Sequence, residues 1–352
     1  WKEHRPDLLE QTNKFLSIKE YIFHCLAGQY IIDYSTASAT GLFDVEKREW
    51  SSLAISLHQQ PIEKFSIPVP PDFSIQLSDA QSSFLSLPHS VRWMVGASDG
   101  CCAQLGSGAT QPGDISITVG TSGAVRRLSK SRWIDPHGRV FYYLLDADTF
   151  VCGGATNNAT SVIKWFSSQF LQNPELSLPD FFERIKNQEA GSSGLIFLPY
   201  LFGERAPVYD AAASGVFFGI SVQHTLVHFQ RAVAEGICFA LKSILETLEK
   251  GTDSSRLIVS GGITYSQVWL HMLSDVLGRE LIIATDYDAS AIGAAMIAFQ
   301  ANGQILPRTM ETQYTISPDQ TRVKQYQLSY AVYKTLYESL KNSFHTHRQL
   351  LH

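Results

Sequence analysis

An acidic residue and a turn of glycine and hydroxyl residues lie close together in this sequence. Asp99 ends an apolar, strand-like stretch and has small residues on both sides, within residues 95–100 (VGASDG). A second strand-like stretch, residues 117–123 (ITVGTSG), ends on glycine and two hydroxyl residues. A carboxylate can accept a proton, and such a turn offers hydrogen-bond donors to phosphate oxygens. Together the two runs supply what the transfer of a phosphoryl group to an alcohol needs.

A third run ends a strand-like stretch on two glycines. Residues 257–260 (LIVS) lead into Gly261 and Gly262, and an amphipathic stretch follows over 265–277. Glycine lets the backbone lie against a ligand without a Cβ atom in the way, and the helix that begins there can hold phosphate at its N-terminus. Each run is common in isolation, so their order along the chain is what makes them informative.

At these positions the chain resembles the FGGY carbohydrate kinases. The resemblance runs through most of the 352 residues. Its further motifs are Asp33-Tyr34-Ser35, residues 37–44 (ASATGLFD), residues 203–207 (GERAP), residues 231–236 (RAVAEG) and residues 291–295 (AIGAA). Residues 96–100, 153–158 and 203–207 look most like the gluconate kinase branch. Residues 159–160 (AT) depart from the two glycines that are usual in that branch.

The resemblance implies an α/β protein with the two-lobed actin/hexokinase-like (ribonuclease H-like) fold. The family opens with a strand and an Asp-Xaa-Gly-Thr phosphate loop, and this sequence, which begins at Trp1, contains no such run. We therefore expect the first lobe to be incomplete. Residues 1–110 are predicted to form the remainder of the first, sugar-binding lobe without its opening phosphate loop. Residues 111–352 are predicted to form the second, nucleotide-binding lobe, after the glycine-rich residues 106–113.

The resemblance also implies roles for individual residues. Asp99 is expected to be the general base and to lie near a magnesium ion, with Gly100 and Arg205 at the substrate. ATP and Mg²⁺ are the expected cofactors. The residues expected to bind the nucleotide are Gly120, Thr121, Ser122, Gly153, Asn157, Gly261, Gly262 and Ser266.

Each of these assignments has a structural alternative. Asp99 could cap a turn, as Asp-Gly pairs often do, and residues 120–122 could be an ordinary β-turn. The glycine pair could serve packing, and Ser266 could be an exposed serine in the first turn of a helix. One of the two asparagines at 157 and 158 could cap the helix that follows them.

Two charged pairs have structural interpretations that we favour. For Glu204 and Arg205 we prefer a salt bridge that shapes the loop over a contact of Arg205 with an acidic sugar. Arg231 and Glu235 lie four residues apart, so we expect a pair on one helix face or a link from helix to sheet.

The composition limits the class of protein. With 352 residues, 44% of them apolar, the chain can bury a large core, and its length predicts two domains. The net charge is −5 with both signs dispersed, so no basic stripe predicts a nucleic-acid partner. No apolar run approaches the roughly 18 residues that a membrane span requires.

The cysteines favour a reducing environment. The five cysteines show no CxxC spacing, which suits buried thiols in a cytoplasmic protein better than disulfides or a zinc site. Cys101 and Cys102 adjoin Asp99, and we interpret them as small packing residues rather than nucleophiles.

Local patterns predict the elements that carry these residues. Apolar residues at three- and four-residue steps predict helices over 17–26, 158–171, 225–250, 265–277 and 289–301. Strands are predicted over 30–34, 91–96, 114–119, 140–145, 149–152, 256–260 and 280–284. Residues 35–40 and 59–88 are predicted to be irregular, and the segment with His345 and His347 to be a polar tail. The strand–helix–strand–helix order with short loops predicts parallel strands covered by helices.

The sequence thus predicts a cytoplasmic kinase that transfers the γ-phosphoryl group of Mg-ATP to the primary hydroxyl of gluconate, giving 6-phosphogluconate. A kinase of xylulose or of another polyol or ketose stays open, because much of the family's sugar pocket comes from its opening segment. A non-catalytic nucleotide-binding fragment also stays open, because the first phosphate loop is missing. The expected partner is a small-molecule sugar or sugar acid, with no nucleic acid and no membrane, and a homodimer is compatible with the sequence.

Overall fold

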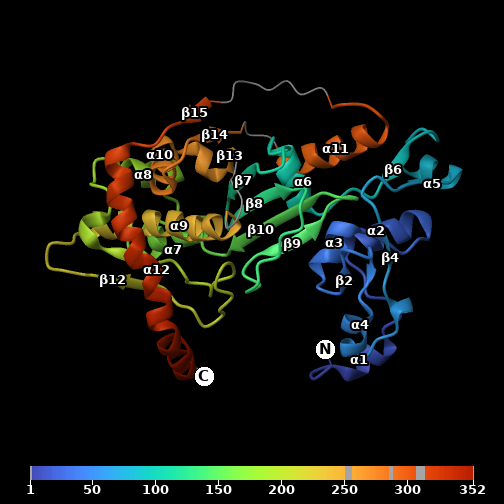
Figure 1. Cartoon of the computed structure of the whole chain (residues 1–352), viewed down its shortest axis with the longest axis horizontal. Helices are drawn as coiled ribbons and strands as arrows, with labels where there is room; N and C mark the ends of the chain where they lie inside the picture. Colours follow the sequence, from blue (N-terminus) through green and yellow to red (C-terminus); the bar gives the residue numbers. More distant parts are fainter. Residues whose placement is uncertain (1, 250–255, 285–287, 307–313, 352) are drawn as a thin grey trace.

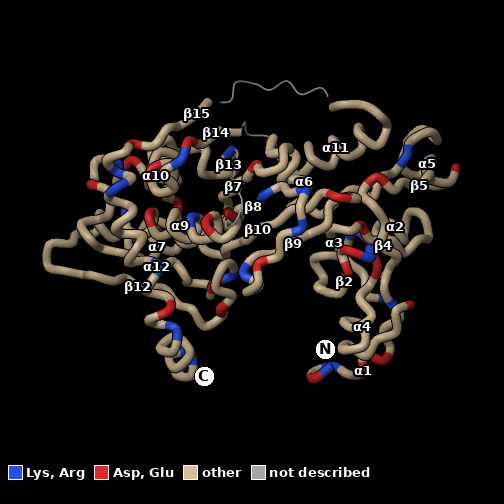
Figure 2. The backbone as a smooth tube through the Cα atoms, in the orientation of Figure 1, with Lys and Arg blue, Asp and Glu red and all other residues tan. Residues whose placement is uncertain are grey.

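The computed structural model describes residues 2–249, 256–284, 288–306 and 314–351, and it has the α/β, two-lobed fold that the sequence predicts (Figure 1). The first lobe, drawn in blue, lies beside a larger lobe that is built on a long sheet. Basic and acidic residues are interspersed over both lobes (Figure 2). None of the described helices combines the length and the apolar character that crossing a membrane requires.

Short elements make up the first lobe. Its helices are α1 (Pro6–Gln11), α2 (Ile18–Ala27), α3 (Tyr34–Ala39), α4 (Ser52–His58) and α5 (Asp79–Phe84). Its strands are β1 (Ile31–Asp33), β2 (Phe43–Asp44), β3 (Glu49–Trp50), β4 (Ile67–Val69), β5 (Ser74–Gln76) and β6 (Arg92–Met94). β1 and β4 pair in parallel, whereas β2 with β3 and β5 with β6 form antiparallel pairs.

A mixed sheet, seven-stranded within the described residues, organises the second lobe. Its order is β15-β14-β13-β7-β8-β10-β9, from β7 (Ile115–Val119), β8 (Gly123–Ser129), β9 (Phe141–Leu144), β10 (Phe150–Thr156), β13 (Leu257–Gly261), β14 (Leu281–Ile283) and β15 (Tyr314–Ile316). β13 is parallel to β7 and β14, and the other neighbouring strands are antiparallel. A separate antiparallel pair consists of β11 (Ile196–Leu198) and β12 (Val216–Phe218).

Helices cover both faces of the large sheet. The main core lies on the face covered by α7 (Thr160–Gln169), α8 (Leu178–Glu183), α9 (Leu226–Leu248), α10 (Gln267–Leu277) and α12 (Gln320–Arg348). A smaller core lies on the other face, under α6 (Asp99–Gly106) and α11 (Ala289–Ala301). Successive strand residues point to opposite faces, so in β8 Val125 belongs to the main core and Leu128 to the smaller one.

The helix predictions agree with the structure at several places. Helix α11 has its predicted range, and α9 fits the prediction up to Leu248, while Lys250 lies outside the described residues. Ser17 caps α2 and Gly28 ends it in the left-handed conformation that glycine favours.

Other predictions of secondary structure are wrong. Residues 35–40 are largely helical because the Asp33 carboxylate accepts hydrogen bonds from the Ser35 and Thr36 amides and caps α3. Residues 59–88 contain β4, β5 and α5. The supposed polar tail is helix α12, whose tyrosines bury one face at three- and four-residue steps: Tyr326, Tyr330, Tyr333 and Tyr337.

The predicted parallel strands are confirmed where β13 pairs with β7 and β14, but β8 introduces antiparallel pairs that the sequence does not predict. The sequence pattern does not reveal this strand, since Arg126 and Arg127 interrupt its apolar residues. β8 pairs antiparallel with both β7 and β10, so half of the sheet runs in alternating directions.

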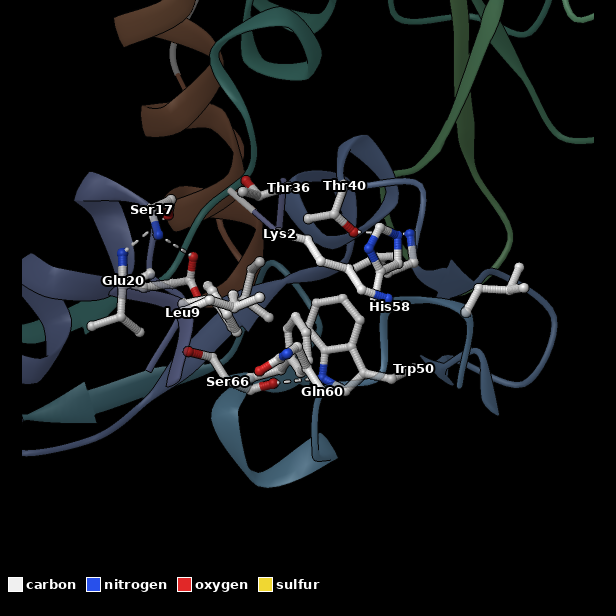
Figure 3. Close-up of a pocket in the computed structure, with 16 residues that line it drawn as sticks. Lys2, Leu9, Ser17, Glu20, Thr36, Thr40, Trp50, His58, Gln60 and Ser66 are labelled. Carbon is white, nitrogen blue, oxygen red and sulfur yellow. Dashed lines mark hydrogen bonds between the residues drawn. The ribbon is translucent and has the colours of Figure 1, made fainter. Parts of the chain in front are cut away.

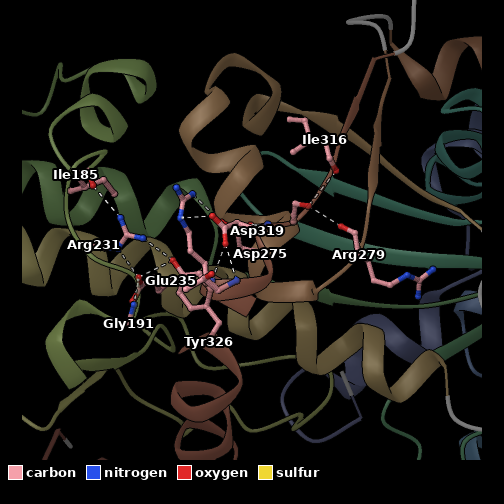
Figure 4. A network of polar contacts seen from close by, with 12 residues as sticks. Ile185, Gly191, Arg231, Glu235, Asp275, Arg279, Ile316, Asp319 and Tyr326 are labelled. Atoms are coloured by element: carbon pink, nitrogen blue, oxygen red, sulfur yellow. Dashed lines mark hydrogen bonds and ion pairs between the residues drawn. The ribbon is translucent and has the colours of Figure 1, made fainter. Parts of the chain in front are cut away.

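A buried ion pair links α9 to α12. Arg231 and Glu235, one turn apart on α9, pair at 2.7 Å, which confirms the predicted helix-face pair (Figure 4). The Tyr326 hydroxyl of α12 donates to Glu235 at 3.0 Å and accepts from Arg231 at 2.8 Å. Burial raises the pKa of Glu235, although the Arg231 charge acts in the opposite direction. The network fixes where α12 crosses α9 on the face of the sheet away from α6.

Helices α6 and α11 cross with their backbones in direct contact. A Cβ atom on Gly106 would overlap the Ala289 carbonyl oxygen, and one on Gly293 would overlap the Cys102 carbonyl oxygen. Only glycine permits an approach this close. Gly293 belongs to the motif at residues 291–295, so packing explains this part of the motif.

The glycine contact predicts that Gly293→Ala lowers the free energy of unfolding. Alanine favours a helix over glycine by about 1 kcal/mol, but overpacking typically costs about 1–3 kcal/mol, and here the obstacle is backbone. We expect a net loss of about 2 kcal/mol in urea denaturation. The control is Ala294→Ser, exposed on the same helix, which should change stability by less than about 0.5 kcal/mol. An unchanged or higher stability of Gly293→Ala would show that the two helices can separate freely.

Candidate active site

Asp99 is the first residue of α6, where the chain passes from the first lobe to the second. Ser98 is the N-cap, and its hydroxyl accepts a hydrogen bond from the Cys101 amide. Asp99 is exposed and its Oδ1 accepts from the Gly100 amide at 2.7 Å. Its Oδ2 has no partner among the residues that the structure describes. Asp99 therefore does not cap the helix, and one carboxylate oxygen is left for a ligand.

The first lobe holds this turn through a series of buried polar contacts. Lys19 and Asp33 form an ion pair in which the Asp33 side chain is 1% exposed. Asp33 accepts a hydrogen bond from the Ser35 hydroxyl, which in turn accepts from the Ser98 amide at 2.7 Å. The motif Asp33-Tyr34-Ser35 thus positions the residue that precedes Asp99.

Gly120, Thr121 and Ser122 form the turn between β7 and β8. The carbonyls of Gly120 and Thr121 accept from the amides of Thr160 and Ser161 at 3.1 and 3.2 Å, at the start of α7. Within the described part of the chain, no hydrogen bond engages the amides of Thr121 and Ser122, and both side chains are exposed. These donors are therefore available to an anion.

Gly261 and Gly262 lie beside this turn, since Gly261 pairs with Val119 of β7. Gly261 has φ +88°, and a Cβ atom there would lie 2.6 Å from the Val119 carbonyl oxygen, so packing requires this glycine. A Cβ atom on Gly262 would lie 3.5 Å from the same oxygen, an ordinary contact, so packing does not explain it. Ser266 is buried rather than exposed, and its hydroxyl caps α10 by accepting from the Trp269 amide at 3.3 Å.

Gly153 and Asn157 lie near the end of β10. A Cβ atom on Gly153 would lie 2.5 Å from the Phe141 ring, so packing explains this glycine and a ligand contact stays a prediction. Asn157 is half-buried, and its carbonyl accepts from the hydroxyl of Ser161, the second residue of α7. The predicted asparagine cap is wrong, because Ala159 is the N-cap of α7 and no side chain caps this helix.

Asn158 and Glu204 anchor the loop at residues 203–207. The side-chain amide of Asn158 donates to the Gly203 carbonyl at 2.7 Å. Glu204 is 4% exposed and accepts from the Thr156 hydroxyl at 2.8 Å. Burial raises the pKa of Glu204 to about 7, while the hydrogen bonds that it accepts act in the opposite direction.

The predicted salt bridge between Glu204 and Arg205 is wrong. The Glu204 carboxylate turns into the protein and accepts from the backbone amide of Arg205 at 2.7 Å. The Arg205 side chain is exposed and pairs with no acidic group in the described residues. Burial raises the pKa of Tyr143, and the charges of Arg205 and Asp99 both act on this phenol. Arg205 is therefore available to an anionic ligand.

Sequence analysis misses Arg126. This residue lies on β8 against the N-terminal turn of α6, where a Cβ atom on Gly100 would lie 3.3 Å from its Nε atom. Two adjacent arginines inside an apolar stretch are the signal that could have found it. Because neighbouring strand residues face opposite sides, one of the two has to point toward α6.

The two cysteines after Gly100 are packing residues, as the sequence predicts. Cys101 and Cys102 are buried in the small core under α6. Burial raises the pKa of the Cys101 thiol to about 12, so it stays protonated and is not a nucleophile.

A hollow of about 570 Å³ lies in the first lobe (Figure 3). Its lining is largely apolar and includes Trp50, whose ring nitrogen donates to the Ser66 carbonyl at 2.8 Å. The Glu20 carboxylate in its wall already accepts from the Ser17 amide at 2.7 Å and caps α2. None of the predicted site residues lines this hollow, so Asp99 is the better candidate for the chemistry.

The protein has two lobes, with a carboxylate at the start of the helix that joins them and a glycine–hydroxyl turn on the second lobe. These are the parts of a kinase that phosphorylates an alcohol. The model of the FGGY family of carbohydrate kinases, C-terminal domain, matches residues 115–301, and that of the N-terminal domain matches residues 1–106. The chain belongs to the FGGY family of carbohydrate kinases. It is therefore a phosphotransferase with an alcohol acceptor, for which the family implies ATP and a small-molecule sugar. The predicted boundary between residues 110 and 111 stays a prediction.

Individual relatives extend the comparison. A gluconokinase of Bacillus subtilis (strain 168) is 31% identical over 368 residues, which cover 97% of this chain and 69% of the relative. The crystal structure of gluconate kinase from Lactobacillus acidophilus is 27% identical with a TM-score of 0.91, covering 98% of this chain and 71% of that one. The structure of a ligand-bound xylulose kinase from the same organism gives the same identity, the same TM-score and the same coverage of both chains. The chain spans 69–71% of the lengths of these proteins.

The buried carboxyl in the 203–207 loop predicts a pH dependence of stability that Glu204→Gln should remove. Folding raises the pKa of Glu204 from its ordinary 4.5 to about 7, so the native protein holds this proton more tightly than the unfolded chain. Its contribution is fully present below pH 4.5 and is lost as the pH rises through about 7, by up to about 3.5 kcal/mol at about 1.4 kcal/mol per pKa unit.

Denaturation at about pH 5 and about pH 8 measures this difference. The wild type should lose more stability between the two than Glu204→Gln does. Parallel pH profiles for the two proteins would show that Glu204 does not titrate in this range.

Proposed function

We propose that this protein is an ATP-dependent gluconate kinase, which phosphorylates the C6 hydroxyl of gluconate and forms 6-phosphogluconate. The observation that carries the proposal is the exposed Asp99 carboxylate, with one oxygen left for a ligand, at the start of the helix that joins the two lobes. The 31% identity with a gluconokinase of Bacillus subtilis supports gluconate as the acceptor.

Asp99 acts as the general base in this proposal. A sugar hydroxyl is a poor nucleophile at neutral pH, and a carboxylate within hydrogen-bond reach takes its proton as the oxygen attacks the γ-phosphorus. The new oxygen–phosphorus bond forms while the bond between the γ-phosphorus and the bridging oxygen breaks, and ADP leaves. Closure of the lobes keeps water out, because water would otherwise take the phosphoryl group.

The nucleotide binds the second lobe in this proposal. The amides and hydroxyls of residues 120–122 hold phosphate oxygens, and residues 261–262 lie against the nucleotide where no side chain intervenes. Gly153, Asn157 and Ser266 border the same ligand. Asp99 also suits Mg²⁺, which binds proteins through one or two carboxylates together with substrate phosphates and neutralises phosphate charge when bound.

Arg205 and Gly100 face the acceptor in this proposal. An exposed guanidinium without an acidic partner in the described residues pairs well with the carboxylate of a sugar acid. We also propose a cytoplasmic location, which suits the four buried free thiols of Cys101, Cys102, Cys152 and Cys238. A homodimer remains a prediction.

A second candidate is a kinase of xylulose or of another polyol or ketose, with the same mechanism. Its support is the similarity to a xylulose kinase structure, which equals the similarity to the gluconate kinase structure. A coupled ADP-release assay over gluconate, xylulose and other polyols separates the two, with mass spectrometry of the product. A clear preference for gluconate supports the proposal, and a preference for xylulose supports the second candidate. Nucleotide binding without ADP release for any sugar would mark a non-catalytic chain.

The base assignment predicts that Asp99→Asn lowers kcat by about 10²–10⁴-fold, because the amide cannot accept the proton. ATP binding and the melting temperature should change little, since Asp99 is exposed and does not cap α6. Asp72→Asn, at another exposed aspartate, is the control and should keep the wild-type kcat. A variant at Asp99 that retains most of its turnover would remove this residue from the mechanism.

The glycine pair predicts that Gly262→Val weakens ATP binding and leaves the binding of sugar alone nearly unchanged. The structure has room for a Cβ atom at this position, so the fold should tolerate the change. Gly261→Val is the matched comparison and should lower the melting temperature. Its φ is +88°, and a Cβ atom there would clash with the Val119 carbonyl oxygen. Calorimetric titration with ATP and with gluconate measures both. Equal losses for the two ligands in Gly262→Val, with a lower melting temperature, would assign this glycine to packing.

A further inference from the structure

Arg126 points from the sheet toward the start of α6. On β8 it shares a face with Leu128, which packs in the small core beneath that helix, while Arg127 faces the other way. Its guanidinium lies over Gly100, where a Cβ atom would meet Nε at 3.3 Å and one terminal nitrogen at 3.7 Å. A Cβ atom at residue 100 would require the guanidinium to shift slightly, so this glycine gives Arg126 its room beside Asp99.

This guanidinium has few protein partners. Its hydrogen bond in the described part of the chain runs from Nη1 to the Thr118 hydroxyl at 3.4 Å, and it forms no ion pair there. The Thr118 hydroxyl lies 3.2 Å from that of Ser260, the residue before Gly261, so the contact continues toward the glycine pair. A guanidinium carries five N–H donors, and most of them find no acceptor here.

The position is electrostatically costly without an anion. Arg126 is half-buried, and burial lowers its pKa while the nearby Cys101, Asp99 and Tyr143 act in the opposite direction. Asp99 does not neutralise it by direct pairing. The N-terminus of α6 adds partial positive charge to the same spot. A cation placed this way is stabilised when an anion enters, and its fork of donors suits oxygen anions.

We propose that Arg126 binds an oxygen anion beside Asp99, namely the phosphoryl group during its transfer. The inference rests on the proposed function, because Asp99 then deprotonates the hydroxyl that the phosphorus must reach. A cation next to Asp99 is thus near the transferred group, and it balances the charge on the equatorial oxygens. The carboxylate of gluconate is the other source of oxygen anions, but it is five carbon–carbon bonds away from the reacting C6.

The test compares Arg126→Met, Arg126→Lys and the control Arg127→Met. Arg127 lies on the opposite face and donates to the Leu248 carbonyl at the end of α9. Arg127→Met should therefore lower the melting temperature and leave kcat unchanged at temperatures where the variant is folded. Arg126→Met should lower kcat by about 10²–10³-fold with gluconate and with xylulose alike. Arg126→Lys keeps the charge without the fork and should recover part of the rate. If Arg126→Met does not fold, Arg126→Lys is compared with the wild type and with Arg127→Met instead.

Equilibrium binding gives a readout that does not need turnover. Arg126→Met should weaken the binding of a non-hydrolysable ATP analogue and leave the binding of ADP unchanged, because only the former has a γ-phosphate. A rise confined to the KM or Kd of gluconate, with xylulose and the ATP analogue unaffected, would overturn the phosphoryl assignment and make the substrate carboxylate the anion. Unchanged kinetics and binding in a folded Arg126→Met protein would overturn the site altogether. A wild type that prefers another sugar would refute the proposed function and leave the ATP-analogue comparison as the test of Arg126.

Discussion

Gly106 of α6 and Gly293 of α11 bring two helix backbones into contact, and the arrangement around Asp99 depends on this crossing. Side chains normally keep helices 8–10 Å apart, and their rotamers allow small adjustments. Here carbonyl oxygens occupy the places where Cβ atoms would be, so there is no flexible group to adjust. The helix that begins with Asp99 is therefore fixed against the second lobe. This rigidity suits the role proposed for Asp99, because a general base has to stay within hydrogen-bond reach of its substrate.

The first lobe holds the same residue from the other side. The buried Asp33 carboxylate, which pairs with Lys19, accepts from the Ser35 hydroxyl, and this hydroxyl accepts from the Ser98 amide. Removing one member of a buried polar series leaves the others unsatisfied, so such a series defines one geometry. Asp99 thus lies at the junction of two lobes, each of which contributes to its position.

Much of the candidate site follows from the sequence, because glycine and aspartate motifs depend on short-range backbone chemistry. The strand-to-glycine turn at Gly120 and the range of α11 are examples. Contacts between distant segments do not follow from local patterns: Glu204 turns inward to Thr156, 48 residues away, rather than to its neighbour. Strand β8 is also hard to predict, because strands are recognised by an apolar pattern and Arg126 interrupts that pattern. A charged side chain that breaks a local rule in this way often marks a functional site.

The central claim is that Asp99 meets the acceptor hydroxyl where the second lobe presents the phosphates. A crystal structure with gluconate and a non-hydrolysable ATP analogue tests this claim most directly. The account predicts O6 of gluconate within about 2.6–3.2 Å of an Asp99 carboxylate oxygen, and the phosphates on the amides of residues 120–122. A sugar bound with its hydroxyls away from Asp99, or a nucleotide bound away from this turn, would contradict it.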